Sequence, residues 1–357
     1  MKRIFFLLFI IISTTIPLAA QVTTSTLSGR IIEEDTSLPI AGVTILAVHE
    51  PTGTRSYTMS GDNGSYSLTG LQSGGPYTVS FSMLGYAQDS FSSLSLALGE
   101  VTRLDAVLSP VQLDAAVITQ MASKLRLTRT GSSKNITSGQ IDAMPTISRS
   151  ITDYIRLSPF ANDMSLAGGD GRMTNFTVDG ANFNNNYGLN SKLPGGGNPI
   201  SIEAIDEIQL VISAYDVRQT GFIGGGINTV TKSGSNTFKG TAYAYYAKRP
   251  TSNWIVGATA GGPIIKNKLF FFLNYEQENK PQNVISYRAR LDNETPGGNI
   301  SRTKLSDMNR VSEFLKSFYG YNPGSATDFP SDNRNRKALL RLDWNINNAH
   351  RLTTRYN

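Results

Sequence analysis

The stretch from residue 223 to residue 246 most constrains what this chain can fold into. Its glycine-rich start, IGGG, leads through the run INTVT and the turn SGSN into a segment in which two kinds of side chain alternate. Phe, Gly, Ala, Ala and Tyr occupy the even positions of 238–246, and Lys, Thr, Tyr and Tyr occupy the odd positions. This period of two predicts a β-strand whose two faces meet different surroundings.

Residues 1–20 have the pattern of a secretory signal peptide. Lys2 and Arg3 supply a positive start, residues 4–12 are an unbroken apolar run, and PLAA precedes the expected mature start at Gln21. A transmembrane anchor is the alternative, but the apolar run is shorter than the roughly 20 residues that a spanning helix needs. The chain has no cysteine, so we expect neither a lipid at the mature N-terminus nor a disulfide.

Composition narrows the class further. The 357 residues include 33 Gly, 15 Tyr and 16 Phe, and only 17% are charged, which favours a β-rich chain with many turns and two or more domains. No later segment is apolar enough for a spanning helix, so membrane residence after export requires a β-barrel. The basic residues are scattered, with no cluster interleaved with aromatics, and we expect no nucleic-acid partner.

The first folded unit is predicted to be a small antiparallel β-sandwich at 21–110. Short alternating runs separated by Gly, Pro and Asn turns support it, at 27–32, 43–48, 56–60, 65–69, 77–83 and 101–108. The segments SGRI (28–31), LPIAGV (38–43), DNGSY (62–66), YTV (77–79) and GY (85–86) resemble the carboxypeptidase regulatory-like domain, whose fold is a transthyretin-like sandwich. The resemblance is specific for the fold and implies little about activity.

Beyond residue 110 the regular alternation of short strands and turns ends. The extended segment 111–119 is either a linker or edge strand, or a strand that pairs with a partner protein by β-augmentation. Residues 148–157 predict a short helix that Ser150 and Asp153 cap, with strands at 175–178 and 205–212. A Gly/Asn-rich excursion covers 179–198, and Asp179-Gly180 within it favours a turn over a metal site.

A second resemblance covers roughly residues 111–280. The segments that carry it are PTISRSITDYIRLSP (145–159), NFTVDGANFNNNYGLN (175–190), ISIEAIDEIQLVISAYDVRQTGFIGGGINTVTKSGSNTFKG (200–240) and GGPIIKNKLFFFLNYE (261–276). They resemble the plug and first barrel strands of TonB-dependent outer-membrane receptors of the Oar-like subgroup. The fold class that the resemblance implies is mainly β: the sandwich, an α+β plug at 111–236, and the first strands of a transmembrane β-barrel at 237–357.

The resemblance also implies partners and sites. It places a candidate TonB box, the strand that a periplasmic TonB-type energy-coupling protein binds, at Asp114, Ala115, Ala116, Val117, Ile118 and Thr119. It suggests ligand contacts at the plug apex, where the candidates are Asn182, Asn184, Asn185, Asn186 and Tyr187; plain turn chemistry is the alternative there. The implied partners are outer-membrane lipid and an extracellular ligand that is a carbohydrate, a peptide or a metal chelate.

Strand patterns after the plug agree with a barrel wall. Residues 269–277, 337–347 and 352–356 alternate, and apolar residues such as Leu340, Leu342 and Trp344 lie opposite Arg341 and Asp343. On one strand a soluble sandwich would look the same. The lengths of the links between strands favour the barrel, in which short turns alternate with long loops. The links at 263–268 and 347–350 are short. The link at 280–336 is long and contains a helical pattern at 305–318 that ends at Gly320. About five strands fit into 237–357, so we expect the N-terminal fragment of a longer receptor.

Catalysis finds no support in the sequence. Without cysteine there is no thiol chemistry, and His49 and His350 have no zinc-binding spacing. We therefore expect no enzyme activity, no cofactor and no metal site. Three functions compete: an energy-coupled importer in the outer membrane, an outer-membrane adhesin or export-associated barrel without energised import, and a soluble β-rich surface protein.

Overall fold

The computed structural model describes most of the chain. The described residues are 23–110, 118–121, 126–128, 131–144, 146, 149–184, 193, 198–214, 221, 223–248, 253–283, 287–324, 330–331, 333–347 and 350–357. The predicted signal peptide at 1–20 lies outside them, as does most of the candidate TonB box. No helix in the described part of the chain is both long enough and apolar enough to span a membrane.

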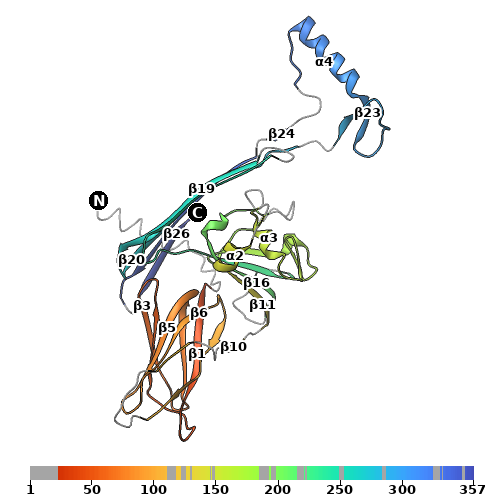
Figure 1. Ribbon diagram of the computed structural model, residues 1–357. Coiled ribbons are helices and arrows are strands. Elements are labelled where there is room, and N and C mark those ends of the chain that lie inside the picture. Colours follow the sequence, from red (N-terminus) through yellow and green to blue (C-terminus); the bar gives the residue numbers. More distant parts are fainter. Residues whose placement is uncertain are drawn as a thin grey trace, which may run out of the picture. The chain divides into compact units, whose positions relative to one another are not determined.

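Two sheets form the N-terminal sandwich (Figure 1). One has the order β10-β7-β1-β4, with β8 also paired to β1, and comprises β1 (Thr24–Glu33), β4 (Ser65–Gln72), β7 (Val101–Arg103), β8 (Ala106–Leu108) and β10 (Arg126–Thr128). The other has the order β3-β2-β5-β6-β9 and comprises β2 (Thr44–His49), β3 (Thr54–Met59), β5 (Gly74–Ser82), β6 (Asp89–Leu96) and β9 (Ile118–Met121). Their inward side chains form one buried core.

The sandwich differs from the prediction in two respects. It is mixed rather than purely antiparallel, because β7 and β8 pair with β1 in parallel and β9 pairs with β6 in parallel. Strand β6 was also not predicted. Ser93 has φ 60° within this strand, and the pairing with β5 shifts register there, so the buried Phe91 and Leu94 are three residues apart and break the period of two.

After the sandwich comes a sheet called here the central sheet, with the order β11-β16-β17-β14-β15. Its strands are β11 (Gly131–Thr137), β14 (Asn175–Val178), β15 (Ala181–Asn182), β16 (Ile205–Ala214) and β17 (Gly226–Thr231). The helices α2 (Ser138–Ala143) and α3 (Ile151–Ile155) contribute to its hydrophobic core. Smaller elements are β12 (Ala161–Asn162), β13 (Ser165–Leu166), η1 (Gly171–Met173) and η3 (Ile202–Ala204).

The helix predicted at 148–157 is confirmed in a shorter form as α3. Its start is as expected: Ser150 accepts from the Thr152 amide, and Asp153 accepts from the Ser150 amide at 3.2 Å. The strands predicted at 175–178 and 205–212 correspond to β14 and β16. Helix α2, which the sequence analysis did not predict, is a short helix with one buried residue, Ile141, and therefore has almost no apolar periodicity.

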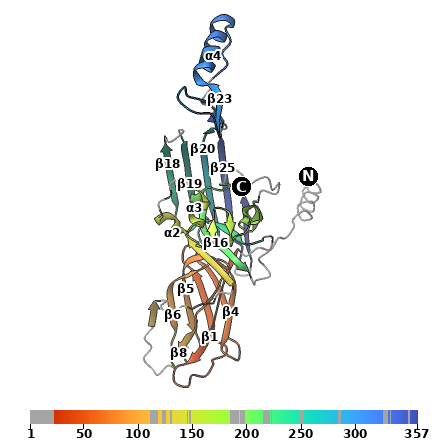
Figure 2. The same cartoon turned by 90° about the vertical axis from the view of Figure 1, so that its right-hand side faces the viewer.

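The last of the large sheets, called here the C-terminal sheet, has the order β18-β19-β20-β25-β26 and is open (Figure 2). It comprises β18 (Lys239–Ala247), β19 (Asn253–Ile265), β20 (Leu269–Asn279), β25 (Arg334–Asn345) and β26 (Arg351–Tyr356). Four of these strands correspond to the alternating runs at 238–246, 269–277, 337–347 and 352–356, and β19 lies between the first two of them. The tight turn between β19 and β20 is also as expected, with Asn267 in a left-handed conformation, φ 62°.

The long connection between β20 and β25 carries its own structure. It contains β21 (Gln282–Asn283) paired with β24 (Pro330–Ser331), and β22 (Arg288–Arg290) paired with β23 (Ile300–Lys304). Helix α4 (Leu305–Tyr319) follows and ends at Gly320, which caps it with φ 64°, as the sequence predicted.

The chain divides into two compact units. The described residues of one lie within 1–241, 259–274 and 338–357, and those of the other lie within 242–258 and 275–337. The sandwich and the central sheet belong to the first unit, whereas the C-terminal sheet contributes residues to both.

Candidate functional site

The polar face of the C-terminal sheet is covered and its apolar face is open. Along β20 the even positions, which include Asn274, Glu276 and Glu278, are buried, whereas Leu273 and Tyr275 on the other face are 43% and 48% exposed. Strand β25 repeats the pattern, with Arg341 buried and Leu340 39% exposed. A soluble sandwich would bury the apolar face, so this inversion is the signature of a wall that faces lipid on one side.

A buried ion cluster occupies the polar face where β20 and β25 lie side by side. Lys337 Nζ is 2.7 Å from Glu276 Oε1 and 2.8 Å from Glu278 Oε2, and Lys280 also pairs with Glu278. Tyr243 donates to the second oxygen of Glu276 at 2.7 Å. Buried ions are tolerated when each has charged and hydrogen-bonding partners. The cluster therefore holds polar side chains in place on a covered face.

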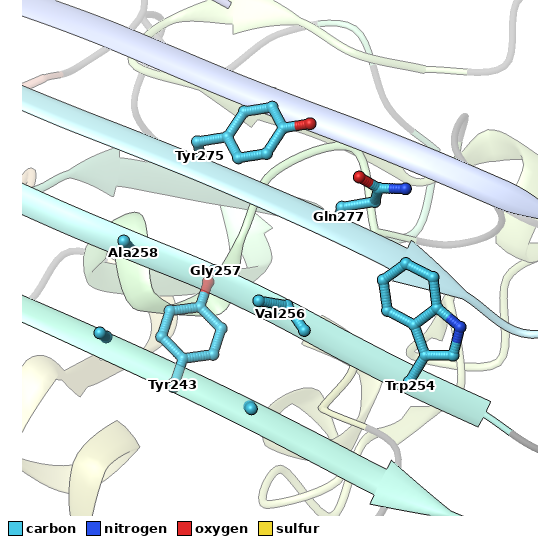
Figure 3. A pocket seen from close by; sticks show the side chains of 9 residues that line it. Tyr243, Trp254, Val256, Gly257, Ala258, Tyr275 and Gln277 are labelled. Carbon is cyan, nitrogen blue, oxygen red and sulfur yellow. The ribbon is translucent and has the colours of Figure 1, made fainter.

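Tyr243 reaches Glu276 by crossing the strand between them. A Cβ at Gly257 in β19 would lie 2.4 Å from Cζ and Oη of Tyr243, so only glycine allows the ring to lie there. Figure 3 shows the Tyr243 ring against Gly257. The three strands β18, β19 and β20 are thereby tied together by one side chain.

The same part of the sheet has an apolar hollow of about 720 Å³. Ala242, Ala244 and Ala258 contribute only methyl groups, and the larger Trp254 and Tyr275 flank the space (Figure 3). Because Thr241 and Thr259 contact each other at 2.7 Å across β18 and β19, the alternation places the three alanines on the face opposite Tyr243. The hollow therefore lies on the open, apolar face.

The covered face of the C-terminal sheet shares a hydrophobic core with the central sheet. Phe272 of β20 and Leu339 of β25 are 5% and 3% exposed, and they join the cluster that contains Phe176, Ile208 and Ile227. These apolar residues interrupt an otherwise polar face. Their position shows that the central sheet packs against this wall.

A polar latch joins the central sheet to β25 and β26. Asp179, in the turn between β14 and β15, accepts from the Thr231 amide at 3.0 Å and from its hydroxyl at 2.6 Å. Arg355 forms an ion pair with the Asp179 carboxylate at 3.2 Å and donates to its carbonyl, also at 3.2 Å. Arg341 donates to the Thr231 carbonyl at 2.5 Å and is held in a forked pair by Asp343.

The latch was not predicted as a site. The sequence analysis placed Asp179 in a turn, and the structure has that turn, with φ 50° at Asp179 and 85° at Gly180. Arg341 and Arg355 were predicted only to lie on the polar face. The signal available in the sequence was a pair of arginines at matching positions of two successive strands, and their partner could not be known before the fold.

Part of the candidate TonB box is in the sandwich sheet. Ile118 and Thr119 begin β9, which pairs with β6 so that Ile118 lies opposite Asp89 and Thr119 opposite Ser90. The other candidates, Asp114, Ala115, Ala116 and Val117, lie outside the described residues. The assignment of the box stays a prediction.

Two of the candidate apex residues support the local fold. The Asn184 side chain accepts from the Phe176 amide at 2.6 Å and donates to Asn175 at 2.8 Å, and Asn182 accepts from the Asn184 amide at 2.8 Å. These are contacts of turn chemistry. Asn185, Asn186 and Tyr187 lie outside the described residues, so ligand contact at this tip also stays a prediction.

Comparison with known proteins identifies two regions. Residues 26–109 match the carboxypeptidase regulatory-like domain, and residues 230–357 match an outer membrane beta barrel domain. The TonB-dependent transporter Oar of Myxococcus xanthus is 26% identical over 94% of this chain, and the match covers 33% of that protein. The chain thus spans about a third of the length of this curated relative.

Two solved structures are similar in part. The siderophore receptor PirA from Acinetobacter baumannii has 19% identity and a TM-score of 0.41, over 60% of this chain and 29% of that one. PirA from Pseudomonas aeruginosa has 14% identity and a TM-score of 0.39, over 62% and 32%. These scores are too low to establish a shared fold. The two resemblances stated from the sequence are nevertheless confirmed by the matches to the domain families and to the curated relative.

Proposed function

We infer that this homologue of the TonB-dependent transporter Oar, with its regulatory-like and outer-membrane barrel domains, is a receptor that imports a ligand across the outer membrane. In this proposal the central sheet is the plug, the C-terminal sheet is the first part of the barrel wall, and the mature chain starts near Gln21. The ligand is a carbohydrate, a peptide or a metal chelate.

One observation carries the proposal: the C-terminal sheet covers its polar face with the central sheet and leaves its apolar face open. A plugged barrel requires this arrangement, because lipid surrounds the outside and the plug fills the inside. The latch of Asp179, Thr231, Arg341 and Arg355 supports it further, because contacts made of hydrogen bonds and ion pairs can be exchanged for water when a plug moves.

The energy-coupling partner is proposed to bind the segment 114–119. The segment has a β-favouring sequence, and pairing through main-chain groups depends little on side chains. Proline lacks the amide proton, so Val117→Pro in the full-length receptor should reduce binding of the purified C-terminal domain of the TonB-type partner by tenfold or more. Val117→Thr, which keeps the amide and is β-branched, is the matched control.

Measurement of that binding by pull-down or calorimetry also separates the alternatives. Equal binding by the Val117→Pro and Val117→Thr receptors would place the box elsewhere. No binding by the wild-type receptor would favour an adhesin or export-associated barrel. Recovery of the full-length protein in the soluble periplasm, rather than in the outer membrane, would remove both barrel functions.

A further inference from the structure

The main chain of one sandwich residue is held by a polar row of the central sheet. Leu98, two residues after β6, donates its amide to both carboxylate oxygens of Glu207 at 3.1 Å. Its carbonyl accepts from Gln209 Nε2 at 2.6 Å and from Asn135 Nδ2 at 3.2 Å. Asn135, Glu207 and Gln209, called here the clamp, thus bind both polar groups of a single peptide residue.

Two of the three clamp residues, Glu207 and Gln209, are buried, and the clamp is already oriented. Leu98 is fully buried, and Glu207 and Gln209 are 3% and 2% exposed. The oxygen of the Gln209 amide accepts from Asn228 at 3.1 Å, which directs its NH₂ group toward Leu98. A polar side chain at this depth is costly unless it is hydrogen-bonded. Removal of Leu98 would therefore leave several groups in need of water.

The clamp also follows from the alternation along β16. Ile208 and Leu210 point into the hydrophobic core, so Glu207 and Gln209 lie on the opposite face of the sheet. Asn135 is the register partner of Gln209 in β11, which brings the third member to the same place. This face would be solvent-exposed in an isolated central sheet.

A second group of contacts reaches the turns beside the C-terminal sheet. Gln72, at the end of β4, donates to Ser233 Oγ at 2.7 Å, and the Pro51 carbonyl accepts from the Asn236 amide at 2.8 Å. The Asn345 amide group donates to Thr54 Oγ1 at 3.0 Å. The sandwich is therefore bonded both to the central sheet and to chain segments that border the wall.

We propose that the regulatory-like domain is a docking domain: it binds the central sheet through Leu98 and holds that sheet in place relative to the rim of the wall. Because the clamp binds main-chain atoms, it recognises a turn of the sandwich rather than a particular sequence. The turn needs only a free amide, a free carbonyl and one apolar side chain that becomes buried on docking. The sandwich would then restrain the central sheet until these contacts are released. Docking does not depend on import, so a negative result for docking would leave the proposed transport function standing.

Cross-linking in the full-length receptor tests the docking directly; this chain has no cysteine, and any cysteine in the rest of the receptor is replaced by serine. The pairs Gln72→Cys with Ser233→Cys, and Thr54→Cys with Asn345→Cys, should be joined by a short bismaleimide in outer-membrane vesicles. Leu84→Cys with Ser233→Cys is the control pair, because Leu84 lies beyond the far end of β5, roughly 30 Å along an extended strand. Absence of cross-links at both test pairs, or equal yield at the control pair, would overturn the proposal.

The clamp is tested by two substitutions in the Gln72/Ser233 cysteine background. Glu207→Leu removes the acceptor of the Leu98 amide, and we expect at least a fivefold slower cross-linking and faster amide hydrogen exchange along β16. Glu207→Gln keeps an acceptor oxygen and should retain cross-linking within about twofold of the parent. If Glu207→Leu cross-links at the parent rate, the clamp does not hold the domain. If the Glu207→Leu receptor fails to assemble, Gln209→Met, which removes a donor to the Leu98 carbonyl, should give the same slowing, and a parent rate would contradict the clamp.

Discussion

At the scale of single residues, contacts across strands decide which side chains this chain tolerates. Tyr243 occupies the space above Gly257 and bonds to Glu276, which is itself paired with Lys337. A glycine in a strand normally weakens it, but here its missing side chain admits an aromatic ring and a buried hydrogen bond. Gly257 therefore weakens its own strand but allows a side-chain contact that links three strands.

Gly257→Ala should displace the Tyr243 ring and destabilise the folded barrel by about 1–3 kcal/mol, the usual cost of overpacking. The measurement is urea unfolding of the full-length receptor in detergent. In a Tyr243→Ala background the same glycine substitution should cost almost nothing, because the clash is gone. An equal cost in both backgrounds would show that the ring is not what requires glycine.

Glu207 should make the docked state sensitive to pH. Burial raises its pKa, the hydrogen bonds from Leu98 and Asn135 lower it in part, and the charges of Asp206 and Glu100 raise it, so that the pKa lies at about 7. A carboxyl whose pKa is higher when buried binds a proton more tightly in that state, so its contribution is complete below about pH 4.5 and is lost as pH rises to about 7.

Cross-linking of the Gln72/Ser233 cysteine pair, normalised to cysteine reactivity at each pH, should therefore be more complete at pH 5 than at pH 8. Glu207→Gln cannot ionise and should flatten the profile. A profile that rises with pH, or one that Glu207→Gln leaves unchanged, would assign the pH dependence to another group.

At the scale of elements, alternation is the property that distinguishes a barrel strand from a strand of a soluble sandwich. In strand β25 the side chains of Lys337, Leu339 and Arg341 are buried, whereas those of Leu340 and Trp344 are exposed. Polar and apolar residues thus exchange the places that they have in a soluble core. The reason is the solvent: one face meets hydrocarbon and the other meets the rest of the protein.

Leu340→Arg should destabilise the wall by about 2–4 kcal/mol if the residue lies near the membrane midplane. Trp344→Arg, one residue from the end of the strand, should cost at most about 1 kcal/mol, because a charge near the interface reaches water. Unfolding of the full-length receptor in lipid vesicles measures both. Equal, small costs at the two positions would show that this face is wet.

At the scale of the whole molecule, the first unit holds together through polar contacts between its sheets as well as a shared core. The latch joins the central sheet to β25 and β26, and the clamp joins the sandwich to the central sheet. Polar contacts of this kind fix one geometry while they last, and water can replace them when they break. That combination suits the proposed role of the central sheet as a plug that is held in place and then moved.

Asp179→Asn and Arg355→Gln should each weaken the latch, and a double-mutant cycle should give a coupling energy of about 0.5–3 kcal/mol. Hydrogen exchange along β14 in the full-length receptor measures the loss. Thr353→Val, which removes only the hydroxyl that contacts Asp343, is the control and should change exchange little. Strict additivity of the two substitutions would show that the ion pair does not contribute.

Much of the fold was predictable because it depends on local rules. The capping pair Ser150 and Asp153 marks the start of α3, and Gly320 marks the end of α4, since each places a hydrogen-bonding group or a left-handed residue where a helix terminus needs one. Four of the five strands of the C-terminal sheet follow from their period of two. Strand β6 was not predicted because a bulge at Ser93 breaks that period.

The sequence by itself determined the order of strands and turns, the two faces of each barrel strand, and the families to which the two matched regions are related, because these depend on spacing along the chain. Only the tertiary structure decided which distant residues meet: Asp179 with Arg355, Tyr243 with Glu276 across Gly257, and Leu98 with Glu207. Each of these contacts joins residues far apart in the chain, and their side chains show no pattern until the sheets bring them together.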